Sequence, residues 1–361
     1  MIARCAAVLA GVLVALAIGT PAQAHTADAP TASDYRTAVT GITPPLPGLT
    51  VRVVEAGARL ELVNHTRRTI EVLGYAGEPY LQVRPDGVDQ NANSPTAYIN
   101  ETLTGGVAPP PGAGPAVAPA WQRLSGTPAV LWHDQRTHWI AARPPSNVLA
   151  DPGTAHHIRD WSVPLRDGVR TFTVTGTLDW VPPPSPAIWW AGCLLLGTAL
   201  AGLGLLRSPA AARWPALVAI GCGLAAAGYA LGTALDSGAL TAAGVARAVL
   251  AQQTWPVVCA LAAVAAGTYA ALHRPAADLA LAIAGTCLAL FSGIANAAVF
   301  AHGVVPQPWP AGLARVLVLL AVSGGLGVAA ASVLRLRSLS PPPSPTTTPV
   351  GVLLNGPVED G

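Results

Sequence analysis

Lysine is absent from this 361-residue chain, because all 20 of its Lys and Arg residues are arginine. That absence excludes a Walker-type phosphate loop, a Schiff base and a lysine general base. Charge of either sign is scarce, since 11% of the residues are charged, against about 25% in average soluble domains. The net charge is +2 and no basic run occurs. Nothing in the composition therefore favours a nucleic-acid partner.

Cysteine is also rare, and none lies between residues 25 and 186; the five are Cys5, Cys193, Cys222, Cys259 and Cys287. That stretch therefore has no disulfide framework, no cysteine-type zinc site and no blue-copper site. We interpret the last four as small apolar residues of buried helices. No G-x-S-x-G elbow, HExxH helix or paired-carboxylate motif occurs in a credible context. We expect that the protein is not an enzyme.

Hydrophobic residues make up 52% of the chain, and the mean hydropathy is +0.46. Residues 1–24 read as a secretory signal peptide, with Arg4, an apolar run over 6–18 and the tripeptide Ala22-Gln23-Ala24. Cleavage after Ala24 would make His25 the first residue of the mature protein. An uncleaved signal anchor is the alternative interpretation.

Residues 25–181 have a different character, with short apolar and polar alternation at 51–54, 59–63, 69–73, 80–83, 129–132 and 171–178. A period of two with many β-branched residues predicts strands with one buried face. The stretch 107–120 is rich in Pro, Ala and Gly and predicts a long loop. We expect that residues 25–181 form an all-β, immunoglobulin-like sandwich.

A stiff proline-rich spacer at 182–186 separates this domain from five apolar runs, at 187–206, 215–235, 249–272, 279–301 and 313–334. Each run approaches the roughly 20 residues that a helix needs to cross a bilayer. We therefore predict a multi-domain protein with a transmembrane bundle of five helices over 187–337. Residues 338–361 are rich in Pro and Thr and predict a disordered tail.

Basic side chains follow the first, third and fifth runs: Arg207, Arg213, His273, Arg274, Arg335 and Arg337. Cytoplasmic loops carry an excess of arginine, so these segments and the C-terminus are expected in the cytoplasm. The signal peptide independently places the N-terminal domain outside. We predict a multi-pass protein of the cell membrane whose partner is the lipid bilayer and whose N-terminal domain is extracytoplasmic.

The most unusual polar stretch is Trp132-His133-Asp134-Gln135-Arg136-Thr137-His138-Trp139. Residues 25–181 hold six of the eight histidines, and imidazole is a common ligand of copper. An N-terminal His25 could chelate Cu(II) through its amine and its ring. The candidate metal ligands are His25, His133, Asp134 and His138, with copper(II) as the candidate cofactor.

An extended stretch would place His133 and His138 on opposite faces, about 16 Å apart at roughly 3.3 Å per residue. The two could then share an ion only if a turn formed between them. Two other interpretations stay open. In one, Asp134 and Arg136 form a salt bridge within a purely structural cluster. In the other, Trp132, Arg136 and Trp139 form a metal-free surface that binds an envelope protein.

The segments 33–37, 74–80, 94–98 and 132–139 resemble an actinobacterial family of multi-pass membrane proteins with an exported N-terminal domain. Members commonly read W-H-D-H-R-T-H-W where this chain has Gln135 at the middle histidine. The resemblance implies that architecture and no activity. A looser similarity is to CopC-type exported copper-binding proteins, and it rests on a signal followed by histidine and on a β-sandwich. It carries over His25, and more weakly Asp134 and His138, as copper ligands.

Overall fold

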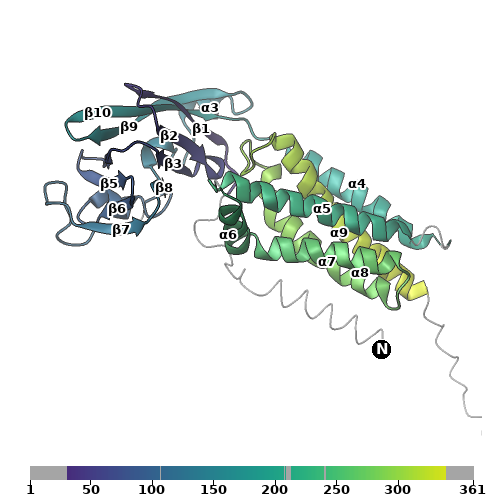
Figure 1. Ribbon diagram of the computed structural model, residues 1–361. Helices are drawn as coiled ribbons and strands as arrows, with labels where there is room; N and C mark the ends of the chain where they lie inside the picture. The colour runs from purple at the N-terminus through teal and green to yellow at the C-terminus, as the bar shows by residue number, and fades with distance from the viewer. Residues whose placement is uncertain (1–30, 106, 207, 209–212, 240, 339–361) are drawn as a thin grey trace, which may run out of the picture.

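The computed structural model describes residues 31–105, 107–206, 208, 213–239 and 241–338. The predicted signal peptide, His25, Arg207 and the tail beyond Ser338 lie outside the described residues. The described chain forms a β-domain followed by a bundle of long helices (Figure 1). The fold class predicted from the sequence is confirmed.

The β-domain contains two antiparallel sheets. A seven-stranded sheet has the order β1-β10-β9-β4-β5-β6-β7, and a three-stranded sheet has the order β2-β3-β8. The strands are β1 (Tyr35–Thr43), β2 (Leu49–Val54), β3 (Arg59–Asn64), β4 (Ile70–Leu73), β5 (Pro79–Arg84), β6 (Gly87–Asn91), β7 (Trp121–Ser125), β8 (Ala129–Trp132), β9 (His156–Asp167) and β10 (Arg170–Trp180). Short turns and helices connect them: η1 (Glu55–Gly57), α2 (Pro95–Ile99), η2 (Gln135–Thr137) and α3 (Ser146–Ala150).

The core of the β-domain lies between the sheets because alternate residues of each strand face inward. In β4 the exposed fractions of Ile70 and Val72 are both 0%, whereas their neighbours are partly exposed. Val163 and Phe172 from β9 and β10 join the same apolar cluster. The alternation of apolar and polar residues along β4 therefore predicted its buried face correctly. The Pro-rich stretch 107–120 contains no strand, as predicted.

Five described helical segments are long and apolar enough to cross a membrane: Pro186–Leu205, Arg213–Asp236, Thr254–Ala271, Ala277–Phe300 and Ala311–Ser338. Their elements are α4 (Pro186–Gly202) with η3 (Leu203–Leu205), α5 (Arg213–Asp236), α7 (Thr254–Ala271), α8 (Ala277–Cys287) with the π-helix η4 (Leu288–Gly293) and η5 (Ile294–Phe300), and α9 (Ala311–Ser338). The protein is a multi-pass membrane protein with a separate β-domain. The predicted third run, 249–272, is divided, because its first residues belong to a separate helix, α6 (Ala242–Gln252).

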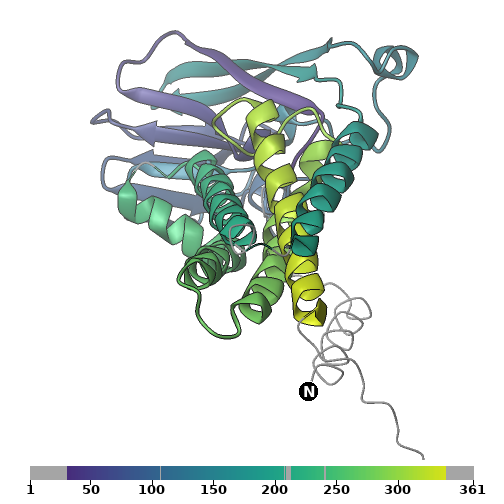
Figure 2. The same cartoon turned by 90° about the vertical axis from the view of Figure 1, so that its right-hand side faces the viewer.

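Small residues allow the helices to approach closely. A Cβ atom on Gly324 would lie 2.1 Å from the Sγ of Cys222, and one on Gly325 would lie 2.6 Å from the carbonyl oxygen of Gly285. Close backbone approach at glycine is a common way for membrane helices to pack. Cys222 therefore packs as a small apolar residue, as the sequence predicted. Figure 2 shows the helices side by side in front of the β-domain.

The β-domain docks on one end of the bundle. Ser33 and Val304 form a backbone bridge, with N···O distances of 3.0 and 2.8 Å. Asp34 accepts a hydrogen bond from the Gly303 amide at 2.8 Å and pairs with Nδ1 of His302 at 3.0 Å. The segments between α5 and α7 and between η5 and α9 lie at the domain end (Figure 1). The proline-rich spacer is thus not the only connection between the two parts.

Candidate functional site

The 132–139 stretch forms a turn instead of continuing as a strand. Strand β8 ends at Trp132, and the Asp134 side chain caps η2 by accepting from the Arg136 amide at 3.1 Å. The Thr137 hydroxyl donates to the Asp134 carbonyl at 2.8 Å, and the Thr37 hydroxyl donates to the Thr137 carbonyl at 2.6 Å. The extended backbone therefore ends at Asp134, and residues 135–137 form a helical turn.

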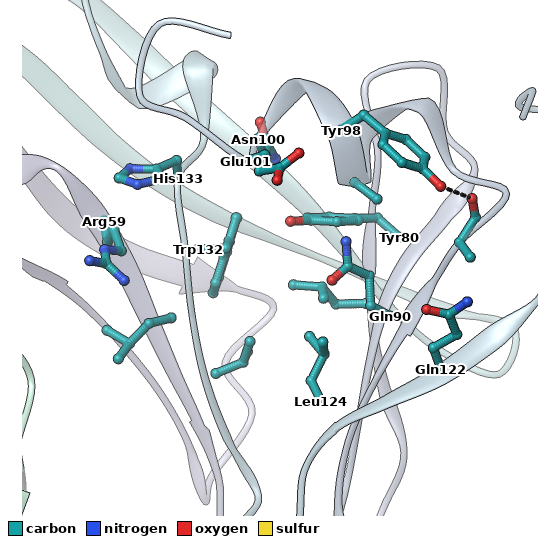
Figure 3. Close-up of a pocket in the computed structure, with 15 residues that line it drawn as sticks. Arg59, Tyr80, Gln90, Tyr98, Asn100, Glu101, Gln122, Leu124, Trp132 and His133 are labelled. Atoms are coloured by element: carbon teal, nitrogen blue, oxygen red, sulfur yellow. Dashed lines mark hydrogen bonds between the residues drawn. The ribbon is translucent and has the colours of Figure 1, made fainter. Parts of the chain in front are cut away.

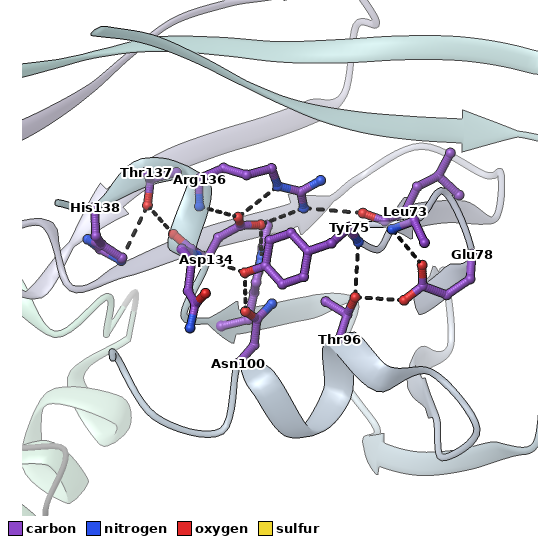
Figure 4. Close-up of polar contacts among 12 residues, drawn as sticks. Leu73, Tyr75, Glu78, Thr96, Asn100, Asp134, Arg136, Thr137 and His138 are labelled. Atoms are coloured by element: carbon purple, nitrogen blue, oxygen red, sulfur yellow. Dashed lines mark hydrogen bonds and ion pairs between the residues drawn. The ribbon is translucent and has the colours of Figure 1, made fainter. Parts of the chain in front are cut away.

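The Asp134 carboxylate is the centre of a buried network (Figure 4). Its exposed fraction is 0%, and the Arg136 guanidinium binds both of its oxygens, at 2.8 Å through Nε and 2.7 Å through Nη2. The indole of Trp132 donates to the same carboxylate at 3.1 Å. Arg136 also lies 4.9 Å from the centre of the Tyr75 ring. The structure thus contains the salt bridge that the sequence left as one interpretation.

The two histidines of the stretch are both buried. His133 is buried, and its Nδ1 lies 2.7 Å from the carbonyl oxygen of Ala58. Burial, with a smaller effect of the neighbouring His133, lowers the pKa of His138 to about 4, although Asp134 acts in the opposite direction. His138 is therefore neutral at neutral pH.

The candidate metal ligands do not converge on one point within the part of the chain that the structure describes. Over those residues, no group of three or more His, Cys, Asp or Glu side chains could hold a metal ion. The Asp134 oxygens already bind Arg136 and Trp132, so this carboxylate is not free to coordinate. A copper site would need His25, which lies outside the described residues.

The tryptophans of the stretch point in different directions. Trp132 has an exposed fraction of 4% and belongs to the core. Trp139 is partly exposed, stacks on Tyr35 with ring centres 6.3 Å apart and donates to the Arg143 carbonyl at 2.9 Å. Of the three predicted partner-binding residues, Trp139 and Arg136 are partly exposed and Trp132 is buried. The aromatic pair therefore does not form one exposed surface.

A cleft of about 390 Å³ opens beside Trp132, between the free edges of the two sheets (Figure 3). This volume lies within the range of ligand pockets. Strands β5, β6, β7 and β8 and helix α2 contribute most of its wall. The lining residues with polar groups are Arg59, Tyr80, Gln90, Tyr98, Asn100, Glu101, Gln122, Trp132 and His133.

Asn100 lies in this wall close to the hydroxyls of Tyr75 and Tyr80. Its Oδ1 accepts from the Tyr75 hydroxyl, whereas its buried Nδ2 has no partner of good geometry among the described residues. Gln90 and Gln122 lie on adjacent strands of the wall. The only cationic side chain other than histidine in the wall, Arg59, is paired with Glu55 at 2.6 Å. The cleft thus offers uncharged amides and hydroxyls next to an indole ring.

The sequence did not identify these residues. Gln90, Asn100 and Gln122 are distant in the chain, and no periodicity or motif links them; only their side-by-side strands and α2 bring them together. A second, smaller cavity of about 110 Å³ contains His138, Trp139 and Tyr35. The 132–139 stretch therefore separates two cavities, with Trp132 and His133 lining one and His138 and Trp139 lining the other.

Comparisons with protein-family models, characterised proteins and solved structures gave no match for this chain. Membership of the actinobacterial membrane-protein family therefore stays a prediction. The function is inferred below from the geometry of the chain itself.

Proposed function

We propose that this protein is a membrane-anchored binding module without enzymatic activity, whose β-domain faces the outside of the cell. Its ligand is a small, uncharged molecule rich in hydroxyl and amide groups, such as a sugar, bound in the cleft beside Trp132. The observation that carries the proposal is the 390 Å³ cleft whose wall gathers the amides of Gln90, Asn100 and Gln122 beside the indole of Trp132. A ligand with several hydroxyl groups would satisfy these amides with hydrogen bonds in place of water.

The wall residues support this choice of ligand. Gln90, Gln122 and Asn100 each carry both a donor and an acceptor, which suits hydroxyl groups. Glu55 compensates the charge of Arg59, so the site does not favour an anion. Trp132 supplies an apolar ring against which a sugar ring can pack. Glu101 lies at the exposed rim and would accept hydrogen bonds from hydroxyls.

A titration of the full chain in lipid nanodiscs with N-acetylglucosamine tests the binding site, because this probe carries both hydroxyl and amide groups. Binding to the native state raises the melting temperature and changes the fluorescence of Trp132. Gln90→Leu should abolish the effect. The matched control is Gln82→Leu, on the neighbouring strand β5, where the amide pairs with Glu71 outside the cleft. Equal responses of the two variants would contradict the cleft as the site.

The distribution of arginine supports the orientation. Arg213, Arg274, Arg335 and Arg337 lie at the end of the bundle remote from the β-domain, and such arginines favour the cytoplasm. At the domain end, Arg315 is held by the carbonyl oxygens of Val299, at 2.9 Å, and of neighbouring loop residues.

Protease treatment of intact cells tests the orientation, with one epitope tag in the 166–170 hairpin and another after residue 361. The hairpin tag should be cut and the C-terminal tag spared. The opposite pattern would contradict the proposal.

Copper homeostasis is a second candidate function, motivated by the two buried histidines of the 132–139 stretch. It requires His25 as a third ligand. Cu(II) alone, titrated into the same preparation, should then bind more weakly after His138→Ala or after one residue is added before His25, and more weakly at acid pH. Unchanged affinity in both variants would exclude copper and leave the cleft proposal unaffected.

A further inference from the structure

Aromatic side chains mark the level of the membrane boundary at the domain end of the bundle. Trp189 and Trp190 lie near the start of α4, and both pack against Phe300 at the end of η5, with ring centres 5.6 and 5.5 Å apart. The exposed fraction of Trp190 is 43%. Tryptophan at the end of a spanning helix is typical of the boundary between lipid and water. The lipid tails therefore end near the level of Phe300.

One end of the β-domain lies close to this level. A Cβ atom on Gly303 would lie 2.5 Å from the carbonyl oxygen of Val181, the residue after β10. Gly303 follows Phe300 by three residues, and three residues span at most about 10 Å. The headgroup layer of a bilayer is about 5–8 Å thick on each side. The end of β10 therefore lies at or just above the lipid headgroups.

Helix α3 and the loop before it are held beside this end of β10. The Trp180 indole donates to the carbonyl oxygen of Pro152, just after α3, at 3.1 Å. The ring of Tyr35 packs edge-to-face on Trp180, with centres 5.3 Å apart, and stacks on Trp139 at the start of the loop. Figures 1 and 2 show α3 on the bundle side of the β-domain, next to the start of α4 and outside the outline of the helices. This part of the β-domain therefore faces the membrane surface and not the bundle.

The segment 140–150 exposes apolar side chains at this level. Its sequence is Ile-Ala-Ala-Arg-Pro-Pro-Ser-Asn-Val-Leu-Ala. The exposed fractions of Ile140 and Leu149 are 52% and 59%, whereas Val148 is buried and anchors α3 in the domain. The side chain of Arg143 is exposed and forms no ion pair among the described residues. The segment thus combines exposed apolar side chains with one available positive charge.

These features fit a lipid surface better than a protein partner. Two large apolar side chains are too few for a stable protein interface, which buries about 800 Å² per partner. They suit shallow insertion at the boundary between headgroups and tails. An arginine beside them can bind lipid phosphates. The acidic residue that follows α3, Asp151, has its own partner in the hydroxyl of Thr154, at 2.9 Å.

We propose that the segment 140–150 is a second membrane contact of this protein, through which the β-domain rests on the lipid headgroups beside α4. Ile140 and Leu149 insert at the boundary between headgroups and tails, and Arg143 binds lipid phosphate. The β-domain is then held both by the ends of the helices and by the bilayer itself. The proposal depends neither on the cleft nor on which side of the membrane the domain faces, because both sides present headgroups.

Quenching by labelled lipid tests this contact. The full chain is placed, one copy per disc, in phosphatidylcholine nanodiscs that contain a lipid with a nitroxide near the start of its acyl chain. A fluorophore on Ala142→Cys should be quenched. The same fluorophore on Val169→Cys should not, because this exposed residue lies in the β9–β10 turn, 11 residues from Trp180, or about 36 Å along the strand. The native cysteines lie in the helices, and the labelled native chain gives their signal for subtraction.

Two variants of the Ala142→Cys chain then test the side chains that make the contact. Ile140→Ser/Leu149→Ser should reduce the quenching to the level seen at residue 169, and Arg143→Gln should weaken it. The matched control is Val117→Ser, because Val117 is also an exposed apolar residue, in the 107–120 loop, and it should leave the quenching unchanged. Equal quenching at residues 142 and 169 would overturn the proposal. So would unchanged quenching in both the double variant and Arg143→Gln.

Discussion

The Asp134–Arg136 pair offers the sharpest test of how the 132–139 turn is held. Asp134 has an exposed fraction of 0%, and its carboxylate accepts from Arg136 through two side-chain nitrogens and from the Trp132 indole. Asp134→Asn keeps the shape and removes the charge. Loss of one partner from a buried ion pair costs about 3–5 kcal/mol. Because Asn still accepts one hydrogen bond, we expect a loss of about 3 kcal/mol, at the lower end of that range.

The assay is thermal unfolding of the full chain in detergent, followed by tryptophan fluorescence. For a domain of this size, about 1 kcal/mol shifts the melting temperature by roughly 2–4 °C. The β-domain transition of Asp134→Asn should therefore fall by about 6–12 °C. The reasoning assumes that the β-domain unfolds as one unit, and coincident fluorescence and circular-dichroism transitions would verify that.

The control variant is Asp167→Asn. Its ion pair with Arg68 spans 2.8 Å, but the Arg68 side chain is 49% exposed. An exposed pair contributes up to about 1 kcal/mol. Equal shifts for Asp134→Asn and Asp167→Asn would refute the view that burial makes the Asp134 network the anchor of the turn.

Three further outcomes are expected. The pKa of His138 lies near 4 in the folded chain, below an unfolded value of about 6.5. Neutral His138 therefore contributes up to about 3 kcal/mol to the free energy of unfolding above pH 6.5, and this contribution is lost as the pH falls from 6.5 through 4. The free energy of unfolding of His138→Asn, measured by chemical unfolding at several pH values, should lack this pH dependence. In Gly176→Ala, the new Cβ would lie 2.1 Å from an indole ring and 2.2 Å from a carbonyl oxygen. It should cost about 1–3 kcal/mol, whereas Gly41→Ala, with nothing within 4 Å, should be near neutral in the same melting assay. The hydrogen bond to Asp34 raises the pKa of His302. The contact between Asp34 and residues 302–304 is therefore most stable below the pKa of histidine in the unfolded chain, and it weakens as the pH rises through the raised pKa of the folded chain. The protection of the 303–304 amides from hydrogen exchange, measured relative to their intrinsic rates at each pH, should fall over that range, whereas in His302→Gln it should not depend on pH.

Sequence and structure differ most at the 132–139 stretch. The residue types showed that this stretch was special, but they left open whether it continues as a strand or turns, and the structure has a turn at 135–137. The reason is local, because the Asp134 side chain competes with strand hydrogen bonding by capping its own turn. The structure therefore buries His133, His138 and Trp132, and it commits the Asp134 carboxylate to Arg136.

The sequence by itself determined the architecture: a β-domain, five spanning helices and the end of the bundle at which arginine gathers. Periodicity and hydropathy depend only on residues that are close together in the sequence, so both can be read from the sequence without the structure. Only the tertiary structure decided where a ligand could bind, because Gln90, Asn100 and Gln122 meet through strand pairing and helix placement. It also decided that the β-domain rests on α5 through a strained turn at Ala56. Contacts between residues 180 positions apart depend on how the whole chain packs, and no local pattern encodes them.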